Sequence, residues 1–124
     1  MLESSELVAF VAATDLERAR TFYEQTLGLR VLEHNDFAVV LDANGTMLRV
    51  SAVGQIARAG YTVLGWRVRD ITASARALAA QGVTFLRYEG MSQDDDAIWT
   101  APSGDKVAWF ADPDGNTLSL TQGG

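Results

Sequence analysis

The segment LVAFVAATDLERARTFYEQTLG, residues 7–28, carries three structural signals in order. It begins with a short apolar run, which is typical of a buried strand, and continues to Thr14 or Asp15, either of which can cap a helix. The apolar residues after this cap recur at the spacing of one helical face, and Gly28 is a natural left-handed helix end. The segment therefore predicts a strand followed directly by a helix.

The segment TVLGWRVRDITASARALAAQG, residues 62–82, has the same order of signals, with Asp70 or Thr72 as the residue that can cap its helix. The separation along the chain between the helix-capping residues Asp15 and Asp70 nearly equals that between Gly28 and Gly82. Repetition at a nearly constant offset indicates two copies of one supersecondary unit. Each unit is too short to build a sufficient core alone, so the two are expected to share one domain.

Further strands are expected after each helix, with a turn before the last strand. The turn is Asp42-Ala43-Asn44-Gly45 in the first half, and Asp112-Pro113-Asp114-Gly115 is its counterpart in the second. The two turns lie further apart along the chain than the two helix caps do, which places extra residues between Tyr88 and Asp105. The expected strands are 29–33, 37–41 and 47–51 in the first half, and 83–87, 107–111 and 117–121 in the second, to which 98–100 can add. The predicted class is α+β, a single domain of residues 1–124 with modules 5–53 and 61–122.

The composition excludes several classes of function. The chain has 124 residues, 48% of them hydrophobic, no cysteine, and a net charge of −6. The missing cysteines exclude disulfides and thiolate metal sites, and the negative charge argues against nucleic acid and anionic membranes as partners. No apolar run is long enough to span a bilayer, and the acidic start Met1–Glu6 does not resemble a signal peptide. A cytoplasmic protein is predicted.

Three segments together resemble the vicinal oxygen chelate superfamily, which includes glyoxalase I, extradiol dioxygenases, fosfomycin-resistance enzymes and bleomycin-resistance proteins. They are Asp15–Tyr23, Leu27-Gly28-Leu29 and Asp112-Pro113-Asp114-Gly115-Asn116. The resemblance covers nearly the whole chain. It implies two βαβββ modules whose eight strands form a curled mixed sheet, an open cup with the helices outside. It also implies an active site in the cup and a homodimer.

The resemblance further implies four cup-facing positions at which the family's enzymes hold a divalent metal. In this sequence they are Val8, Val63, Arg49 and Ser119. Valine has no donor atom, arginine is a permanent cation, and one serine is a poor anchor for a transition ion. No metal or other cofactor is therefore predicted. The alternative is a divalent ion (Zn, Ni, Mn or Fe) held by residues elsewhere.

Other metal donors are few. The one histidine, His34, is expected at a hairpin tip as a solvated turn residue. The run Asp94-Asp95-Asp96 lacks the alternating spacing of a calcium loop and is expected to be a solvated acidic loop. This loop, beside Trp99, could also form a lid over the cup.

Side chains alternate between the two faces of a strand, so every second residue from each of the four positions is expected to face the cup as well. Arg49 and Arg67 could bind a ligand's carboxylate or phosphate, or pair with acidic side chains of the protein. Trp99 and Trp109 could stack on a planar or cationic ligand, or pack within the protein. The predicted ligand-binding residues are Val8, Phe10, Phe37, Val39, Met47, Arg49, Val63, Arg67, Trp99, Trp109, Ser119 and Thr121.

This mostly apolar wall with a few polar groups is typical of a small-molecule pocket. The favoured prediction is a glyoxalase-like or bleomycin-resistance-like protein that binds a small organic molecule in a metal-free cup. The alternatives are a metal-dependent lyase or dioxygenase and a metal-independent isomerase or cyclase that uses a carboxylate. The sequence contains no glycine-rich phosphate loop and no Gly-x-Ser-x-Gly elbow, and no catalytic residue is assigned.

Overall fold

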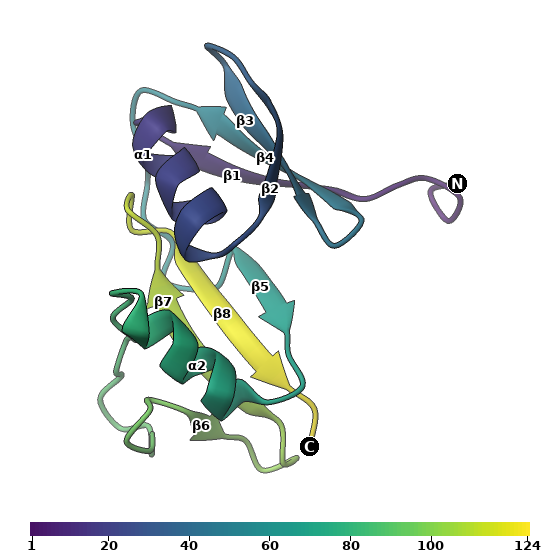
Figure 1. Ribbon diagram of the computed structural model, residues 1–124. Helices are drawn as coiled ribbons and strands as arrows, with labels where there is room; N and C mark the ends of the chain where they lie inside the picture. The colour runs from purple at the N-terminus through teal and green to yellow at the C-terminus, as the bar shows by residue number, and fades with distance from the viewer. The chain divides into compact units, whose positions relative to one another are not determined.

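Each predicted module folds as a four-stranded sheet with helical structure on one face (Figure 1). The computed structural model describes residues 1–124, which form two units, Met1–Ala57 and Arg58–Gly124. The predicted modules 5–53 and 61–122 lie within these units. No helix in either unit is both long and apolar enough to cross a lipid bilayer.

The first unit follows the predicted order of elements. Its elements are β1 (Val8–Ala13), α1 (Leu16–Arg20), η1 (Thr21–Thr26), β2 (Arg30–His34), β3 (Ala38–Ala43) and β4 (Thr46–Ala52). The strand order is β1-β4-β3-β2, in which β1 runs parallel to β4 and the other pairs are antiparallel. Helical structure begins after Asp15, whose Oδ1 accepts a hydrogen bond from the backbone N–H of Arg18 at 3.1 Å. The single predicted helix is in fact a short α-helix that continues as the π-helix η1.

The second unit contains β5 (Leu64–Arg67), α2 (Ile71–Ala80), β6 (Trp99–Thr100), β7 (Lys106–Ala111) and β8 (Thr117–Gln122). The strand order is β5-β8-β7-β6, with β5 parallel to β8. The short β6 lies within the 98–100 segment that was expected to add to this sheet. Both units therefore have the βαβββ character of the predicted α+β class.

The predicted strand 83–87 is wrong. The segment makes one isolated bridge between Phe85 and Phe110, and the backbone N–H of Leu86 donates to the carbonyl of Trp109 at 2.8 Å. Beyond this point the side chain of Gln93 replaces a strand partner. It donates to the carbonyl of Leu86 at 2.9 Å and accepts from the N–H of Tyr88 at 2.8 Å. These side-chain bonds satisfy the backbone groups that a sheet ladder would use.

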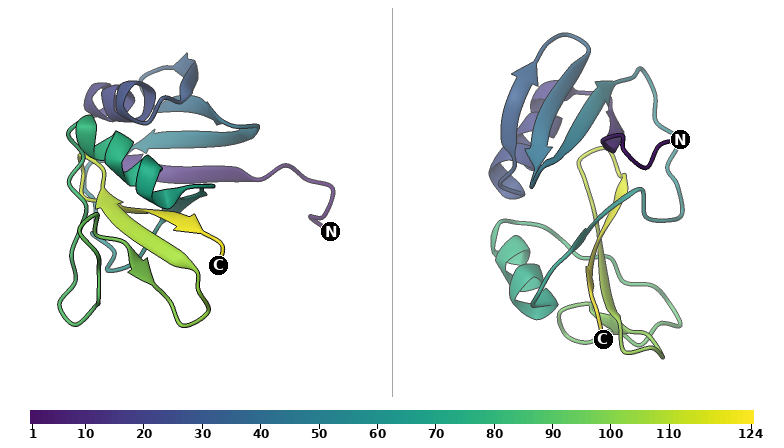
Figure 2. Two further views of the ribbon diagram at one scale, coloured as in Figure 1. Left: turned by 60° about the horizontal axis from the view of Figure 1, so that its bottom comes forward. Right: turned by 90° about the vertical axis from the view of Figure 1, so that its right-hand side faces the viewer.

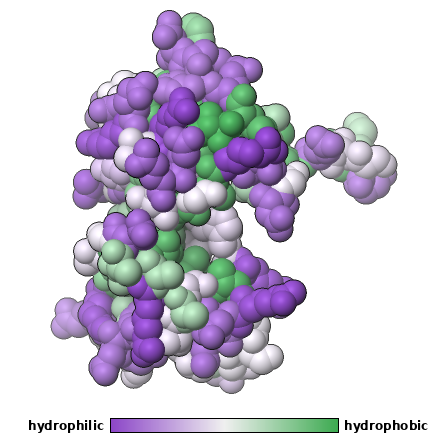
Figure 3. All heavy atoms as spheres, viewed as in Figure 1, coloured by the Kyte–Doolittle hydropathy of each residue, from purple (hydrophilic) through white to green (hydrophobic).

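In each unit helical structure lies against one face of the sheet (Figure 2), and the buried side chains lie between the two. In the first unit Tyr23 of η1 is fully buried, and in the second unit Ile71 and Ala75 of α2 are buried. The buried sheet residues include Val39, Leu41, Leu48 and Val50 in the first unit, and Ala108, Phe110, Leu118 and Leu120 in the second. The outer side of the alanine-rich α2 leaves apolar atoms exposed (Figure 3).

The N-cap of α2 provides a test of the predicted helix start. The Oδ1 atom of Asp70 accepts from the backbone N–H of Ala73 at 3.0 Å. Asp70→Ala is expected to lower the free energy of unfolding by about 1 kcal/mol because it leaves this N–H without its partner. Urea unfolding measures the difference, and Asp70→Asn, which keeps an acceptor oxygen, should lose less. An alanine variant as stable as the parent would contradict the assigned cap.

Candidate functional site

We call the face of each sheet opposite its own helix the open face. In the first unit the strand register places Val8 beside Met47, and Phe10 beside Arg49. Side chains of directly paired residues lie on the same face of a sheet. Val8, Phe10 and Met47 are 38%, 62% and 43% exposed, so this open face carries apolar side chains around a guanidinium.

The predicted position of Val39 on this face is wrong. Val39 pairs with Val50 and is fully buried on the helix side, whereas Val40 pairs with Arg49 and shares the open face. Phe37 lies just before β3 and is 74% exposed.

The error comes from the lengths of the two turns. Asp42 pairs with Met47 in the first unit, and Ala111 pairs with Thr117 in the second. The second connection is one residue longer. A constant offset between the two turns therefore matches Trp109 of β7 to Val39 of β3, whereas the strand pairing matches it to Val40. Because side chains alternate, a shift of one residue moves the side chain to the other face.

The open face of the second unit carries five predicted ligand-binding residues. The register pairs Arg67 with Thr121, Trp109 with Ser119, and both Trp99 and Thr121 with Val107. Val63 lies immediately before β5, and its backbone N–H donates to the carbonyl of Thr117 at 2.9 Å. The predicted shared face for Arg67, Trp99, Trp109, Ser119 and Thr121 agrees with this register.

An aromatic cluster occupies this open face. The ring of Trp109 lies 5.4 Å from that of Tyr88 in an edge-to-face arrangement and 6.2 Å from that of Trp99. Sequence analysis missed Tyr88 because its segment carries no strand alternation. Its backbone N–H donates to the side chain of Gln93, which also donates to the carbonyl of Leu86.

A hollow of about 310 Å³ adjoins Arg67 on the same unit. Its lining combines polar and apolar groups from β5, β7, β8 and the residues next to them: Arg67, Asp105, Val107, Thr121, Gln122 and Gly123. Three of these residues, Arg67, Val107 and Thr121, are paired neighbours on the open face. The hollow therefore brings together a guanidinium, a carboxylate, a hydroxyl and an apolar side chain.

His34 is not the solvated turn residue that was expected. It ends β2, with a half-buried ring whose Nδ1 lies 3.1 Å from Nη1 of Arg20. Its Nε2 lies 3.6 Å from a carboxylate oxygen of Glu17. The histidine thus packs against the helical segment, on the side of the sheet away from the open face.

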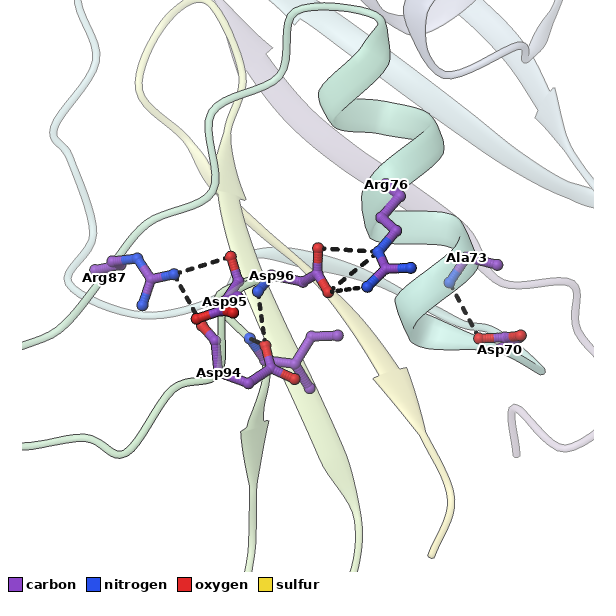
Figure 4. Close-up of polar contacts among 8 residues, drawn as sticks. Asp70, Ala73, Arg76, Arg87, Asp94, Asp95 and Asp96 are labelled. Atoms are coloured by element: carbon purple, nitrogen blue, oxygen red, sulfur yellow. Dashed lines mark hydrogen bonds and ion pairs between the residues drawn. The ribbon is translucent and has the colours of Figure 1, made fainter.

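The acidic loop is bonded towards α2, so the expected lid over the open face is wrong (Figure 4). Asp96 makes an ion pair with Arg76 of α2 at 3.1 Å, and the hydrogen bond with Asp96 raises the pKa of Arg76 above its usual value. The guanidinium of Arg87 donates to the carbonyls of Asp94 and Asp95 at 2.8 and 3.2 Å. These contacts hold the loop on the helix side.

Two βαβββ units, each with an open face that mixes apolar side chains and arginine, define a glyoxalase-like class of protein. The chain matches the family model of the Glyoxalase/Bleomycin resistance protein/Dioxygenase superfamily over residues 7–120, and it belongs to this family.

Solved structures support the same fold. The glyoxalase family protein from Enterococcus faecalis is 25% identical, with a TM-score of 0.74 and coverage of 98% of this chain and 99% of that chain. A superfamily member from Sphaerobacter thermophilus gives the same four values. Lactoylglutathione lyase from Agrobacterium tumefaciens is 18% identical, with a TM-score of 0.72 and coverage of 98% and 96%. A search among curated proteins finds no match.

The residues at the family's four metal positions do not fit a divalent metal ion. Val8 and Val63 offer no lone pair, and Arg49 brings a positive charge to the open face of the first unit. Ser119 is buried, and a Cβ atom at Gly65 would lie 2.8 Å from its Oγ. One crowded hydroxyl cannot supply the ligand set that a transition ion needs.

Proposed function

We propose that this protein binds a small organic molecule on its open faces without the help of a metal ion. One observation carries the proposal: Arg67 shares the open face of the second unit with Trp109 and borders a hollow of about 310 Å³. Small-molecule sites combine apolar and aromatic walls with a few directed polar groups. This arrangement is of that kind.

The arginines of the open faces support ligand binding over a purely structural role. Neither Arg49 nor Arg67 makes an ion pair or a hydrogen bond with a side chain of its own unit. Their guanidinium groups therefore keep their donors for water or for a ligand. The predicted homodimer and cytoplasmic location remain predictions.

Metal content is the first test. The untagged protein would be produced with manganese, iron, nickel and zinc supplied, and then analysed by elemental mass spectrometry. We expect well below one metal ion per chain, because the four positions lack donor atoms. A nearly stoichiometric transition metal in the folded protein would overturn the metal-free proposal and direct attention to lyase or dioxygenase substrates.

Binding is tested on the same metal-free protein by isothermal titration calorimetry with 2-naphthylmethanol, a neutral aromatic probe. We expect saturable binding that a chelator does not change. Trp109→Leu should weaken it about tenfold, or about 1.4 kcal/mol, because the ring stacking is lost. Trp66→Phe is the matched control, since Trp66 pairs with Leu120 on the helix side. Equal effects of the two variants would contradict a site on the open face.

A further inference from the structure

We propose that the end of β5 forms an oxyanion-binding site, in which Arg67 and Arg69 recognise a carboxylate or phosphate group. The inference rests on the proposed function in that this anionic group belongs to the molecule bound on the open face. It gives that molecule a chemical class: an aromatic or apolar organic anion.

Two adjoining hollows meet at Arg67. Besides the hollow of about 310 Å³, a second one of about 490 Å³ is lined by Arg67, Val68, Arg69, Gln122, Gly123 and Gly124. Arg67, Gln122 and Gly123 line both. An anionic group in the second hollow would therefore lie next to a ligand body in the first.

The charges around the second hollow favour an anion. Its lining contains two arginine side chains and no acidic side chain, and the one negative group is the α-carboxylate of Gly124, so the positive charge is in excess. Asp70 follows Arg69 in the chain, and Asp105 lines the adjoining hollow; each of these carboxylates accepts a hydrogen bond from a backbone N–H. Asp70 accepts from the N–H of Ala73 at 3.0 Å, and Asp105 accepts from the N–H of Gly124 at 2.8 Å. The planar fork of arginine matches the paired oxygens of carboxylate and phosphate.

The glycine at position 123 lets the Arg67 guanidinium lie against the main chain. A Cβ atom built on Gly123 would be 2.8 Å from an Nη atom of Arg67. The backbone before this glycine is held in place, because the side chain of Gln122 accepts from the N–H of Ile71 at 2.8 Å. Gly123→Ala would therefore displace the flexible end of Arg67 with little change to the sheet. The substitution is thus a steric probe of the guanidinium position.

The net charge of −6 would by itself repel an anion. Binding of an anion must then depend on the local pair of arginines, and removal of either should have a large effect. A large loss of affinity on removal of one arginine would distinguish a specific site from general attraction of an anion to the protein surface.

The test compares two probes of similar size, 2-naphthoate and neutral 2-naphthylmethanol, by calorimetry on the full chain. We expect 2-naphthoate to bind about tenfold more tightly, which equals about 1.4 kcal/mol. Arg69→Ala, which changes only the second hollow, should remove this preference while the affinity for 2-naphthylmethanol stays unchanged. Arg67 and Gly123 line both hollows, so Arg67→Ala and Gly123→Ala should also remove the preference, by weakening the binding of 2-naphthoate more than that of 2-naphthylmethanol. Arg30→Ala removes the same charge from an exposed position of the first unit and should keep the preference.

The outcomes separate the two proposals. If both probes bind with equal affinity, or if Gly123→Ala and the arginine variants keep the preference, the oxyanion site is overturned and the proposed function stands. If neither probe binds, the proposed function is overturned. In that case a titration with inorganic phosphate tests the oxyanion site by itself. Phosphate bound at the site must shift the NMR signals of the Arg67 and Arg69 Nε–H groups. Unshifted signals would overturn the oxyanion site. Competition between phosphate and 2-naphthoate distinguishes a phosphate site from one that accepts only carboxylate.

Discussion

Phe110→Ala is expected to lower the free energy of unfolding by about 3–5 kcal/mol, a substantial part of the stability of a small protein. Phe110 lies on the helix side of β7 and is fully buried. Its ring lies 5.5 Å from that of Phe85, and it pairs with Leu118 on β8. Removal of the ring would leave a cavity that the surrounding strands can only partly fill. Guanidinium or urea unfolding, followed by circular dichroism, measures the loss.

Phe37→Ala is the matched control, because it deletes the same ring from a side chain that is 74% exposed. Its effect should stay within about 0.5 kcal/mol. Phe110→Leu, which retains most of the apolar volume, should cost less than Phe110→Ala. Similar losses for Phe110→Ala and Phe37→Ala would show that β7 does not pack in the described way.

Asp112→Ala is expected to be the second most damaging substitution, with a loss of about 2–4 kcal/mol. This carboxylate is buried, and its Oδ1 accepts from the backbone N–H groups of Asp114 at 3.0 Å and Asn116 at 2.9 Å. Its Oδ2 accepts from the side-chain amide of Asn116 at 2.8 Å. Alanine would remove three hydrogen bonds, two of them buried, which costs more than the loss of an exposed hydrogen bond.

Asp42→Ala provides the comparison within the same chain, because Asp42 begins the corresponding turn of the first unit. It is half-buried, and its Oδ1 accepts from the backbone N–H of Gly45 at 2.9 Å. A loss of about 1 kcal/mol is expected. Equal losses at the two turns, measured by the same unfolding experiment, would be evidence against a special role for buried carboxylate bonds at Asp112.

Local signals in the sequence were sufficient to predict where helical structure begins and ends in each unit. Two candidate caps were predicted at each helix start, and the structure has Asp15 and not Thr14 at the first, and Asp70 and not Thr72 at the second. An Asp side chain can reach an N–H three residues later with no help from the rest of the fold. Gly28 and Gly82 both have positive φ angles, 78° and 94°, which only a residue without a Cβ adopts readily. These features depend on neighbouring residues, and the repeat therefore revealed the two units, while the family came from the resemblance of the motifs at Asp15–Tyr23, Leu27–Leu29 and Asp112–Asn116.

Which side chains meet at the site depends on the folded chain as a whole. Val40 takes the place predicted for Val39 because the two turns differ by one residue, which no local signal reveals. Tyr88 reaches Trp109 because Gln93 takes the backbone bonds of a predicted strand. The two-arginine hollow needs Gly123 beside Arg67, a contact between residues far apart in the chain. Contacts of this kind depend on strand register and close packing, which are properties of the tertiary structure and not of any single segment.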